Sequence, residues 1–277
     1  MNDPTTSPDP LVVTRDGSTV TVWLNRPDKR NAMNLDMWLA LEDACRSLDP
    51  DTRLLVVRGV GGDFCAGADL TSVGDRPGIS YEASNGNAEL ALTTVPVPTI
   101  AFISGSCVGG GVQIAAACDL RICDTTARFG VTPAKFGIVY PPSATESLVR
   151  LLGVARTKRL LYSADLIDAA EALRIGLVDE IHEPHEAGEH LASFAKRLAS
   201  RSLFTQVASK QMIDEVAATG TIPRPIIERW RIEIGSSPDA QEGISAFLEK
   251  RAPRFTWTPR RPAVDDSDPP RTAPPSV

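Results

Sequence analysis

Two glycine-rich segments hold the residues whose types and spacing have the clearest chemical use. One is Gly61–Leu70, and the other is Gly109-Gly110-Gly111, whose middle glycine is followed three residues later by Gln113. At a helix start, backbone N–H groups have no partner within the helix and lie at the positive end of its dipole. The second segment therefore suits a bound anion, or one that develops during a reaction. The alternative is a tight strand-to-helix turn that needs glycine for a positive φ.

Each segment follows a short apolar run that predicts a buried strand. These runs are Leu54–Gly59 before the first segment and Thr99–Ile103 before the second. If the two strands are neighbours, the N–H groups of Ala68 and Gly110 can converge on one oxygen. Such a pair stabilises an oxyanion, and loss of one donor costs on the order of 3 kcal/mol. For a thioester, the oxyanion would be an enolate or a tetrahedral intermediate.

The rest of the chain predicts alternating strands and helices, and hence an α/β fold with ligands at the carboxyl ends of strands. Alternating apolar residues across Leu11–Leu24, interrupted at Asp16-Gly17, predict a β-hairpin. Thr71–Asn87 is polar and glycine-rich, and we expect a mobile loop over the site. The other expected elements are strands at 120–123, 127–130 and 177–181, and helices at 35–48, 88–94, 143–152, 155–162, 169–175, 190–199, 203–216, 226–233 and 239–250.

The composition is that of a soluble globular protein, and it narrows the choice of partners. The 277 residues are 42% hydrophobic and carry a net charge of −6, which argues against a nucleic-acid or anionic-membrane partner. Because no apolar run reaches about 18 residues and residues 1–10 are polar, neither a membrane span nor a signal peptide is expected. Five cysteines without Cys-x-x-Cys spacing fit reduced thiols in a cytoplasmic protein. His182, His185 and His190 are expected at the surface, with no evident metal-ligand set.

Further segments match a known family in order and spacing. Residues 11–256 resemble the enoyl-CoA hydratase/isomerase family, also called the crotonase superfamily. The resemblance implies a crotonase-like spiral of βαβ turns with a helical C-terminal part. The matching segments are Asn25–Pro27, Lys29–Met33, Phe64–Leu70, Gly109–Gly111, Cys118–Arg121, Phe129-Gly130, Gly153–Arg156, Ala169–Val178 and Glu242–Arg251.

Composition and resemblance together divide the chain into four parts. A flexible N-terminus at 1–10 precedes the crotonase-like α/β core at 11–200. A C-terminal helical trimerisation part follows at 201–258, and the proline-rich segment 259–277 is expected to be a disordered tail. The implied partners are an acyl-CoA and further copies of this chain, in a homotrimer or a hexamer formed as a dimer of trimers.

The resemblance also implies where the substrate lies. The thioester carbonyl would sit between the N–H groups of Ala68 and Gly110, and no cofactor or metal is needed because coenzyme A is part of the substrate. Lys29 or Arg30 would lie near the nucleotide end of CoA, where a basic residue suits phosphate; the alternative is a solvated loop charge. The other residues implied in substrate binding are Ala66, Asp69, Leu70, Gly109 and Pro133.

The chain departs from the family where proton transfer is expected. Family hydratases carry two glutamates, whose positions here hold Gln113 and Pro133. Neither an amide nor a proline can exchange a proton near neutral pH, so hydration by the two-glutamate route is not expected. Tyr140, in a segment Thr132–Tyr140 that resembles the methylmalonyl-CoA decarboxylase branch, has an ordinary pKa of about 10 and can donate a hydrogen bond or a proton. Glu146 is a further candidate, at the start of a predicted helix.

Several functions remain open from the sequence. The leading hypothesis is an acyl-CoA lyase or isomerase of this family that works through an enolate, with Ala68, Gly110, Tyr140 and Gln113 as the catalytic set. The alternatives are an acyl-CoA decarboxylase of the methylmalonyl-CoA type, a catalytically silent CoA-binding subunit and a thioester hydrolase.

Overall fold

The fold is built around a six-stranded sheet, described here from a computed structural model that covers residues 4–71 and 76–259. Its strand order is β1-β2-β3-β4-β6-β9. Only the expected hairpin is antiparallel, and every later pairing is parallel. The strands are β1 (Leu11–Asp16), β2 (Thr19–Leu24), β3 (Leu54–Gly59), β4 (Thr99–Ile103), β6 (Leu120–Asp124) and β9 (Glu180–His182).

Strands β3 and β4 are neighbours, as the sequence predicted. Leu55 pairs with Thr99 and Arg58 with Phe102, so the two glycine-rich segments leave the same edge of the sheet. A second, three-stranded sheet of β5 (Ser106–Val108), β7 (Arg128–Gly130) and β8 (Ile167–Asp168) begins immediately beyond this edge. The backbones of Cys65 and Cys107 of β5 pair in an isolated parallel β-bridge, which joins the first glycine-rich segment to the second.

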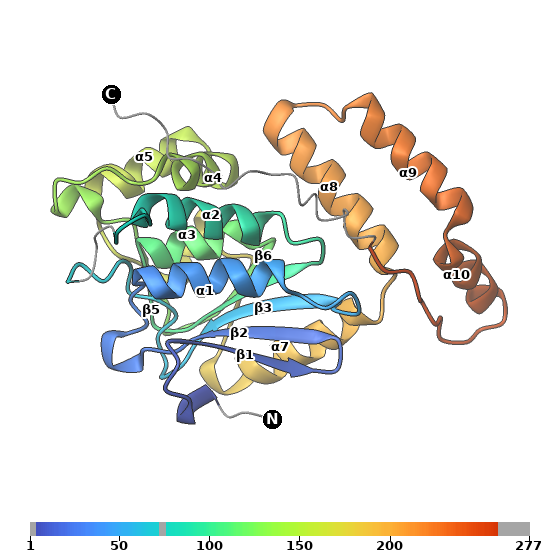
Figure 1. Ribbon diagram of the computed structural model, residues 1–277, viewed down its shortest axis with the longest axis horizontal. Helices are drawn as coiled ribbons and strands as arrows, with labels where there is room; N and C mark the ends of the chain where they lie inside the picture. Colours follow the sequence, from blue (N-terminus) through green and yellow to red (C-terminus); the bar gives the residue numbers. More distant parts are fainter. Residues whose placement is uncertain (1–3, 72–75, 260–277) are drawn as a thin grey trace.

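Helices cover both faces of the main sheet (Figure 1). On one face lie α1 (Leu35–Arg46), α2 (Tyr81–Thr93) and α3 (Gly110–Ala117), which contribute Trp38, Leu92 and Val112 to the principal hydrophobic core. On the other face α7 (Pro184–Ala199) packs with Ala187, Leu191 and Ala195 against strand residues. The remaining elements of this part are η1 (Pro4–Thr6), η2 (Pro27–Lys29), η3 (Pro133–Lys135), α4 (Pro142–Leu152), α5 (Val154–Ser163) and α6 (Ala169–Ile175).

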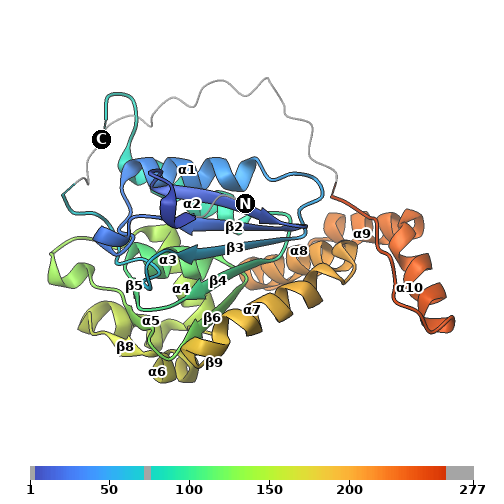
Figure 2. The same cartoon turned by 90° about the horizontal axis from the view of Figure 1, so that it is seen from below.

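The last three helices extend to one side of this body (Figures 1 and 2). They are α8 (Leu203–Thr219), α9 (Arg224–Ser236) and α10 (Pro238–Leu248). A small cluster around Phe204 and Trp230 joins α8 to α9. Their outer faces leave large apolar side chains in solvent, among them Ile213, Ile227, Ile232, Ile244, Phe247 and Leu248.

The largest error of the sequence prediction concerns the loop expected at Thr71–Asn87. Helix α2 begins at Tyr81, whereas the sequence predicted a helix only from residue 88. The Ser80 hydroxyl accepts a hydrogen bond from the Ala83 N–H and caps the helix. Its buried face includes Ser84, Asn85 and Glu89, so no apolar period marks it.

Smaller differences concern element ends. Helix α7 starts at Pro184, six residues before the expected start at His190, and β9 starts at Glu180, three residues after the expected start at Leu177. Within the described ranges, no helix has the length and apolar character needed to cross a bilayer. Residues 72–75 of the expected loop, residues 1–3 and residues 260–277 of the expected tail lie outside the described part of the chain.

Candidate active site

A cavity of about 600 Å³ opens where the two glycine-rich segments meet. Ala66, Ala68 and Leu70 line it from the first segment, and Gly109 and Gly110 from the second. Further walls come from α1, α2, α3 and the stretch after β7, through Trp38, Tyr81, Glu82, Asn85, Gln113, Thr132, Pro133, Phe136, Ile138, Val139 and Tyr140. The structure thus brings most of the predicted site residues to one place.

The backbone around Ala68 turns the N–H of this residue away from Met33, with which it pairs in a parallel β-bridge. Met33 N–H donates to the Gly67 carbonyl at 2.7 Å, and Asp69 N–H donates to the Met33 carbonyl at 2.9 Å. In this parallel bridge, the polar groups of Ala68 itself point to the opposite side. Because Ala68 lines the cavity, its N–H is a candidate donor to a ligand there.

Gly110 carries the second candidate donor. It is the first residue of α3, so no carbonyl of the helix can accept from its N–H. The preceding carbonyl, that of Gly109, accepts from Gln113 N–H at 3.1 Å and from the Tyr140 hydroxyl at 3.0 Å. The peptide unit that carries the donor is therefore held from its carbonyl end.

Gly111 allows the two turns to approach each other. A Cβ atom at this residue would lie 2.4 Å from the Cys65 carbonyl oxygen, closer than any real side-chain contact. Glycine is therefore required here by close approach, in addition to any need for a particular φ.

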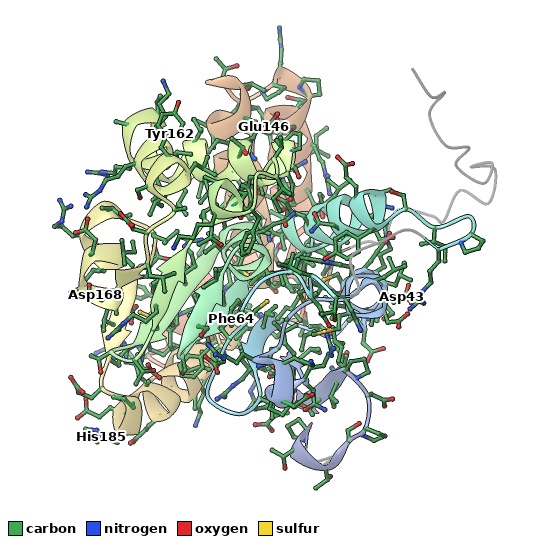
Figure 3. The ribbon with its side chains drawn as sticks, turned by 90° about the vertical axis from the view of Figure 1, so that its left-hand side faces the viewer. Asp43, Phe64, Glu146, Tyr162, Asp168 and His185 are labelled. Atoms are coloured by element: carbon green, nitrogen blue, oxygen red, sulfur yellow. The ribbon has the colours of Figure 1, made fainter. Side chains whose placement is uncertain are left out.

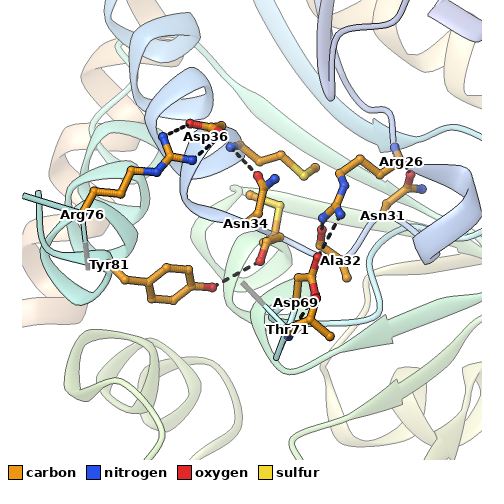
Figure 4. Close-up of polar contacts among 11 residues, drawn as sticks. Arg26, Asn31, Ala32, Asn34, Asp36, Asp69, Thr71, Arg76 and Tyr81 are labelled. Atoms are coloured by element: carbon orange, nitrogen blue, oxygen red, sulfur yellow. Dashed lines mark hydrogen bonds and ion pairs between the residues drawn. The ribbon is translucent and has the colours of Figure 1, made fainter. Parts of the chain in front are cut away.

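Asp69 anchors the first turn (Figure 4). Its Oδ2 lies 2.8 Å from Arg26 Nη2, and its Oδ1 accepts from Thr71 N at 3.1 Å and from Thr71 Oγ1 at 2.6 Å. Arg26 also donates to the Ala32 carbonyl at 2.8 Å. Asp69 is buried and does not line the cavity, so the structure gives it a supporting position and no direct access to substrate.

Lys29 and Arg30 lie outside the cavity, in an exposed turn at η2. The Arg30 carbonyl accepts from the Ala66 N–H at 2.9 Å, which places this basic turn directly beside the rim of the site.

Gln113 is held by a buried polar network. Its Oε1 accepts from Asn85 Nδ2 at 3.0 Å, and its Nε2 donates to Asn85 Oδ1 at 2.6 Å and to Glu89 Oε2 at 2.7 Å. Glu89 also accepts from Ser143 at 2.6 Å and from Ser147 at 3.2 Å. Asn85 was missed because its segment was expected to be a loop, and Glu89, although inside the predicted helix at 88–94, was not identified as a site residue. Their spacing of four residues was the signal that could have identified one helix face.

Two tyrosines at the cavity wall stay protonated. Burial raises the pKa of Tyr140 well above its ordinary value, and its hydroxyl donates to Gly109. Burial also raises the pKa of Tyr81, whose hydroxyl accepts from Trp38 Nε1 at 3.0 Å and donates to the Met33 carbonyl at 3.3 Å. Both phenols therefore act as neutral hydrogen-bonding groups at neutral pH.

Few titratable groups reach the cavity. Among the described residues that line it, Glu82 is the only carboxylate, and Lys, Arg and His are absent. Glu146, considered from the sequence, is exposed and faces Arg150 at 3.7 Å on the surface (Figure 3). Burial raises the pKa of the Cys65 thiol to about 12, so this cysteine supplies no thiolate.

The histidines differ from the sequence expectation. His185 is exposed (Figure 3), but His182 and His190 are half-buried and both contact Glu180. These residues do not line the cavity.

Comparisons of sequence and of structure find similarity to the same family of proteins. Residues 14–258 match a family model described as enoyl-CoA hydratase/isomerase. The chain is 32% identical over 252 residues to crotonyl-CoA hydratase of Syntrophomonas wolfei, covering 88% of this chain and 97% of the relative. It is 34% identical over 257 residues to a putative enoyl-CoA hydratase of Thermus thermophilus, covering 88% and 100%. A solved enoyl-CoA hydratase/isomerase family protein from Hyphomonas neptunium superposes with a TM-score of 0.85 at 32% identity, covering 92% of this chain and 99% of the other.

Proposed function

The chain belongs to the enoyl-CoA hydratase/isomerase family, and from this premise we propose that it transforms an acyl-CoA thioester through an enolate held by Ala68 and Gly110. The supporting observation is the pair of backbone donors that meet at one cavity. The thioester oxygen accepts from both N–H groups, and the positive end of α3 favours its negative charge. Two fixed donors lower the barrier without any reorganisation when the charge develops.

The cavity favours an uncharged, apolar acyl group. Leu70, Phe136, Ile138 and Val139 line it, and no cationic side chain is among its described lining residues. A carboxylate on the acyl chain would find no charged partner there, and burying it unpaired is costly.

The proton carrier in this proposal is Glu82. Gln113 is committed to Asn85 and Glu89, and Tyr140 to Gly109, so neither is free to exchange a proton. Glu82→Gln should then lower kcat by about 10²-fold or more, the usual contribution of a positioned acid or base, with a smaller change in KM. Glu146→Gln, on the surface, is the control, and equal kcat values for the two variants would contradict the assignment.

A second candidate is decarboxylation of a malonyl-type CoA ester. The absence of a proton-transferring side chain at Gln113 and Pro133 favours it, because loss of CO₂ needs an oriented carboxylate and a stabilised enolate, followed by one protonation. A catalytically silent CoA-binding subunit and a thioester hydrolase remain the outcomes to be excluded.

The test is a CoA-ester panel that includes crotonyl and methylmalonyl forms, with solvent deuterium exchange at the α-carbon of saturated esters. Enolate chemistry predicts exchange, whereas binding without exchange or turnover indicates a silent subunit and release of free CoA indicates a hydrolase. Gly110→Pro removes the donor at a position where proline suits a helix start. It should lower kcat by about 10²–10³-fold, whereas Gly110→Ala retains the N–H and should keep most activity.

The C-terminal helices support a further part of the proposal. Their exposed apolar side chains are suited to contacts between copies of the chain, in a homotrimer or a dimer of trimers. We also place the basic turn at Lys29 and Arg30 near the CoA phosphates, and the protein in the cytoplasm without a separate cofactor.

A further inference from the structure

The edge of the main sheet brings three potential metal ligands together, away from the cavity. Glu180 and His182 lie two residues apart on β9, so their side chains share one face of the strand. The intervening Ile181 packs against the principal core on the other face. His190 belongs to α7, which covers the face to which Glu180 and His182 point, and its ring stacks on His182 with centroids 3.7 Å apart.

The ligand atoms of these residues converge on a small space. Glu180 Oε2 lies 3.0 Å from His182 Nε2 and 2.6 Å from His190 Nε2. All three ligand atoms lie within 4.8 Å of one another. The side chains are 38%, 22% and 29% exposed for Glu180, His182 and His190, so the cluster is partly shielded and still open on one side.

We propose that Glu180, His182 and His190 bind a divalent transition-metal ion, with Zn²⁺ the best fit. Two imidazole nitrogens and a carboxylate oxygen are the donor types that Zn²⁺ takes, and the open side admits water as a fourth ligand. Bonds of about 2 Å to a tetrahedral ion set the ligand atoms roughly 3.4 Å apart, so only small side-chain rotations are needed.

Without a metal ion, the two histidines compete for one carboxylate oxygen of Glu180, and a cation would remove this competition. The Nε2 atoms of His182 and His190 both lie close to Glu180 Oε2, but only His182 forms a hydrogen bond with it. The buried Nε2 atom of His190 has no hydrogen-bond partner among the described residues. A divalent ion accepts a lone pair from each of the three groups at once. The site joins the edge strand β9 to α7, and its role is to fasten this edge of the sheet.

The chain contains three histidines, which gives the experiment a matched control. His185 also lies on α7, but its side chain is 78% exposed and faces Glu186 outside the cluster. The untagged full-length protein, stripped of metal, is titrated with Zn²⁺ by calorimetry, and Co²⁺ is added separately to record its visible absorption bands.

The wild type and His185→Ala should each bind one Zn²⁺ per chain and give the same Co²⁺ spectrum. His182→Ala and His190→Ala should each lower Zn²⁺ affinity by on the order of 100-fold and lose the Co²⁺ bands, since even outer partners of metal ligands change affinity by 10–100-fold. Zn²⁺ should raise the unfolding temperature of the wild type and of His185→Ala, and should leave that of the other two variants unchanged.

Two results would overturn the proposal. One is the absence of saturable Zn²⁺ binding to the wild type. The other is unchanged binding in His182→Ala and His190→Ala that circular dichroism shows to be folded. Either result would leave Glu180 as the partner of a metal-free histidine pair.

Discussion

Gln113 shapes the site through its hydrogen bonds and supplies no proton. Both ends of its amide are used by Asn85 and Glu89. Gln113 therefore holds α2 against α3. The carboxylate of Glu89 accepts hydrogen bonds from this amide and from two serine hydroxyls. An acid at residue 113 would change the balance of this network.

Gln113→Glu should make protein stability depend on pH. The new carboxyl group would face Glu89 at the 2.7 Å now spanned by Gln113 Nε2, so the two must share a proton and one pKa rises. A folded-state pKa above the unfolded value means that stability is retained below the unfolded pKa and lost as pH rises. The loss is about 1.4 kcal/mol for each pKa unit.

Urea unfolding at pH 5 and pH 7 measures this effect. Gln241→Glu, at an exposed residue of α10, is the control and should show no comparable difference. Equal stability of Gln113→Glu at both pH values would show that the two carboxyl groups do not share a proton.

Tyr140 is a positioning residue in this site. Its hydroxyl orients the Gly109 carbonyl, and the pKa is raised by burial, so Tyr140→Phe should cost about 1 kcal/mol of unfolding free energy. The expected fall in kcat is below about 10-fold, because general acid catalysis, worth 10²–10⁴-fold, is not removed. Tyr162→Phe, at a 74% exposed residue, is the control for both measurements. A 10²-fold loss of kcat with unchanged stability would instead make Tyr140 the proton donor.

The two glycine-rich turns form a unit because their backbones touch. Cys65 N–H donates to the Ser106 carbonyl at 2.8 Å, and Val108 N–H donates to the Cys65 carbonyl at 2.9 Å. These bonds fix the distance between the strand ends that carry Ala68 and Gly110. The unit depends on the absence of a side chain at Gly111.

Gly111→Ala should destabilise the protein by about 1–3 kcal/mol, the usual cost of overpacking, and should lower kcat by separating the two donors. The cause is the clash of its Cβ with the Cys65 carbonyl. Gly188→Ala in α7 meets no atom within 4 Å and should stabilise by about 0.5–1 kcal/mol, as expected for a helix interior. Thermal unfolding compares the two, and a neutral Gly111→Ala would mean that the turns can move apart freely.

The sequence predicts those elements that have a simple apolar signal. Strands β3 and β4 consist mostly of apolar residues, and the glycine-rich segments after them mark the site. Helix α2 was largely missed because Asn85, Gly86 and Asn87 are poor helix formers. Packing against α1 and hydrogen bonds to Gln113 and α4 stabilise it in the fold. The metal-ligand cluster was missed for a related reason, since pairing of β9 with β6 and packing of α7 bring Glu180 and His190 together only in three dimensions.

Over the whole chain, the C-terminal helices have much less internal packing than the α/β body. Among the described residues, their separate buried cluster consists of Phe204, Ala208 and Trp230, from α8 and α9, while Phe247 of α10 is 82% exposed. The proposed assembly of several copies would cover this apolar surface.

Phe247→Glu should shift the protein toward smaller species in light scattering at micromolar concentration. A charge at a buried contact is costly, whereas in a separate chain the same residue would be solvated. Gln241→Glu introduces the same charge on α10 and should leave the molar mass unchanged. An unaltered mass for Phe247→Glu would exclude this face from the assembly.

The proposed oxyanion donors, the N–H groups of Ala68 and Gly110, belong to the main chain, and this separates two properties that many enzymes link. In the proposed mechanism, glycines and strand register encode the ability to hold a thioester, whereas side chains that line the cavity, such as Gln113 and Glu82, would determine the reaction. Substitution at those side chains removes neither backbone N–H group. A change of reaction could therefore arise by altering side chains around an unchanged pair of main-chain donors.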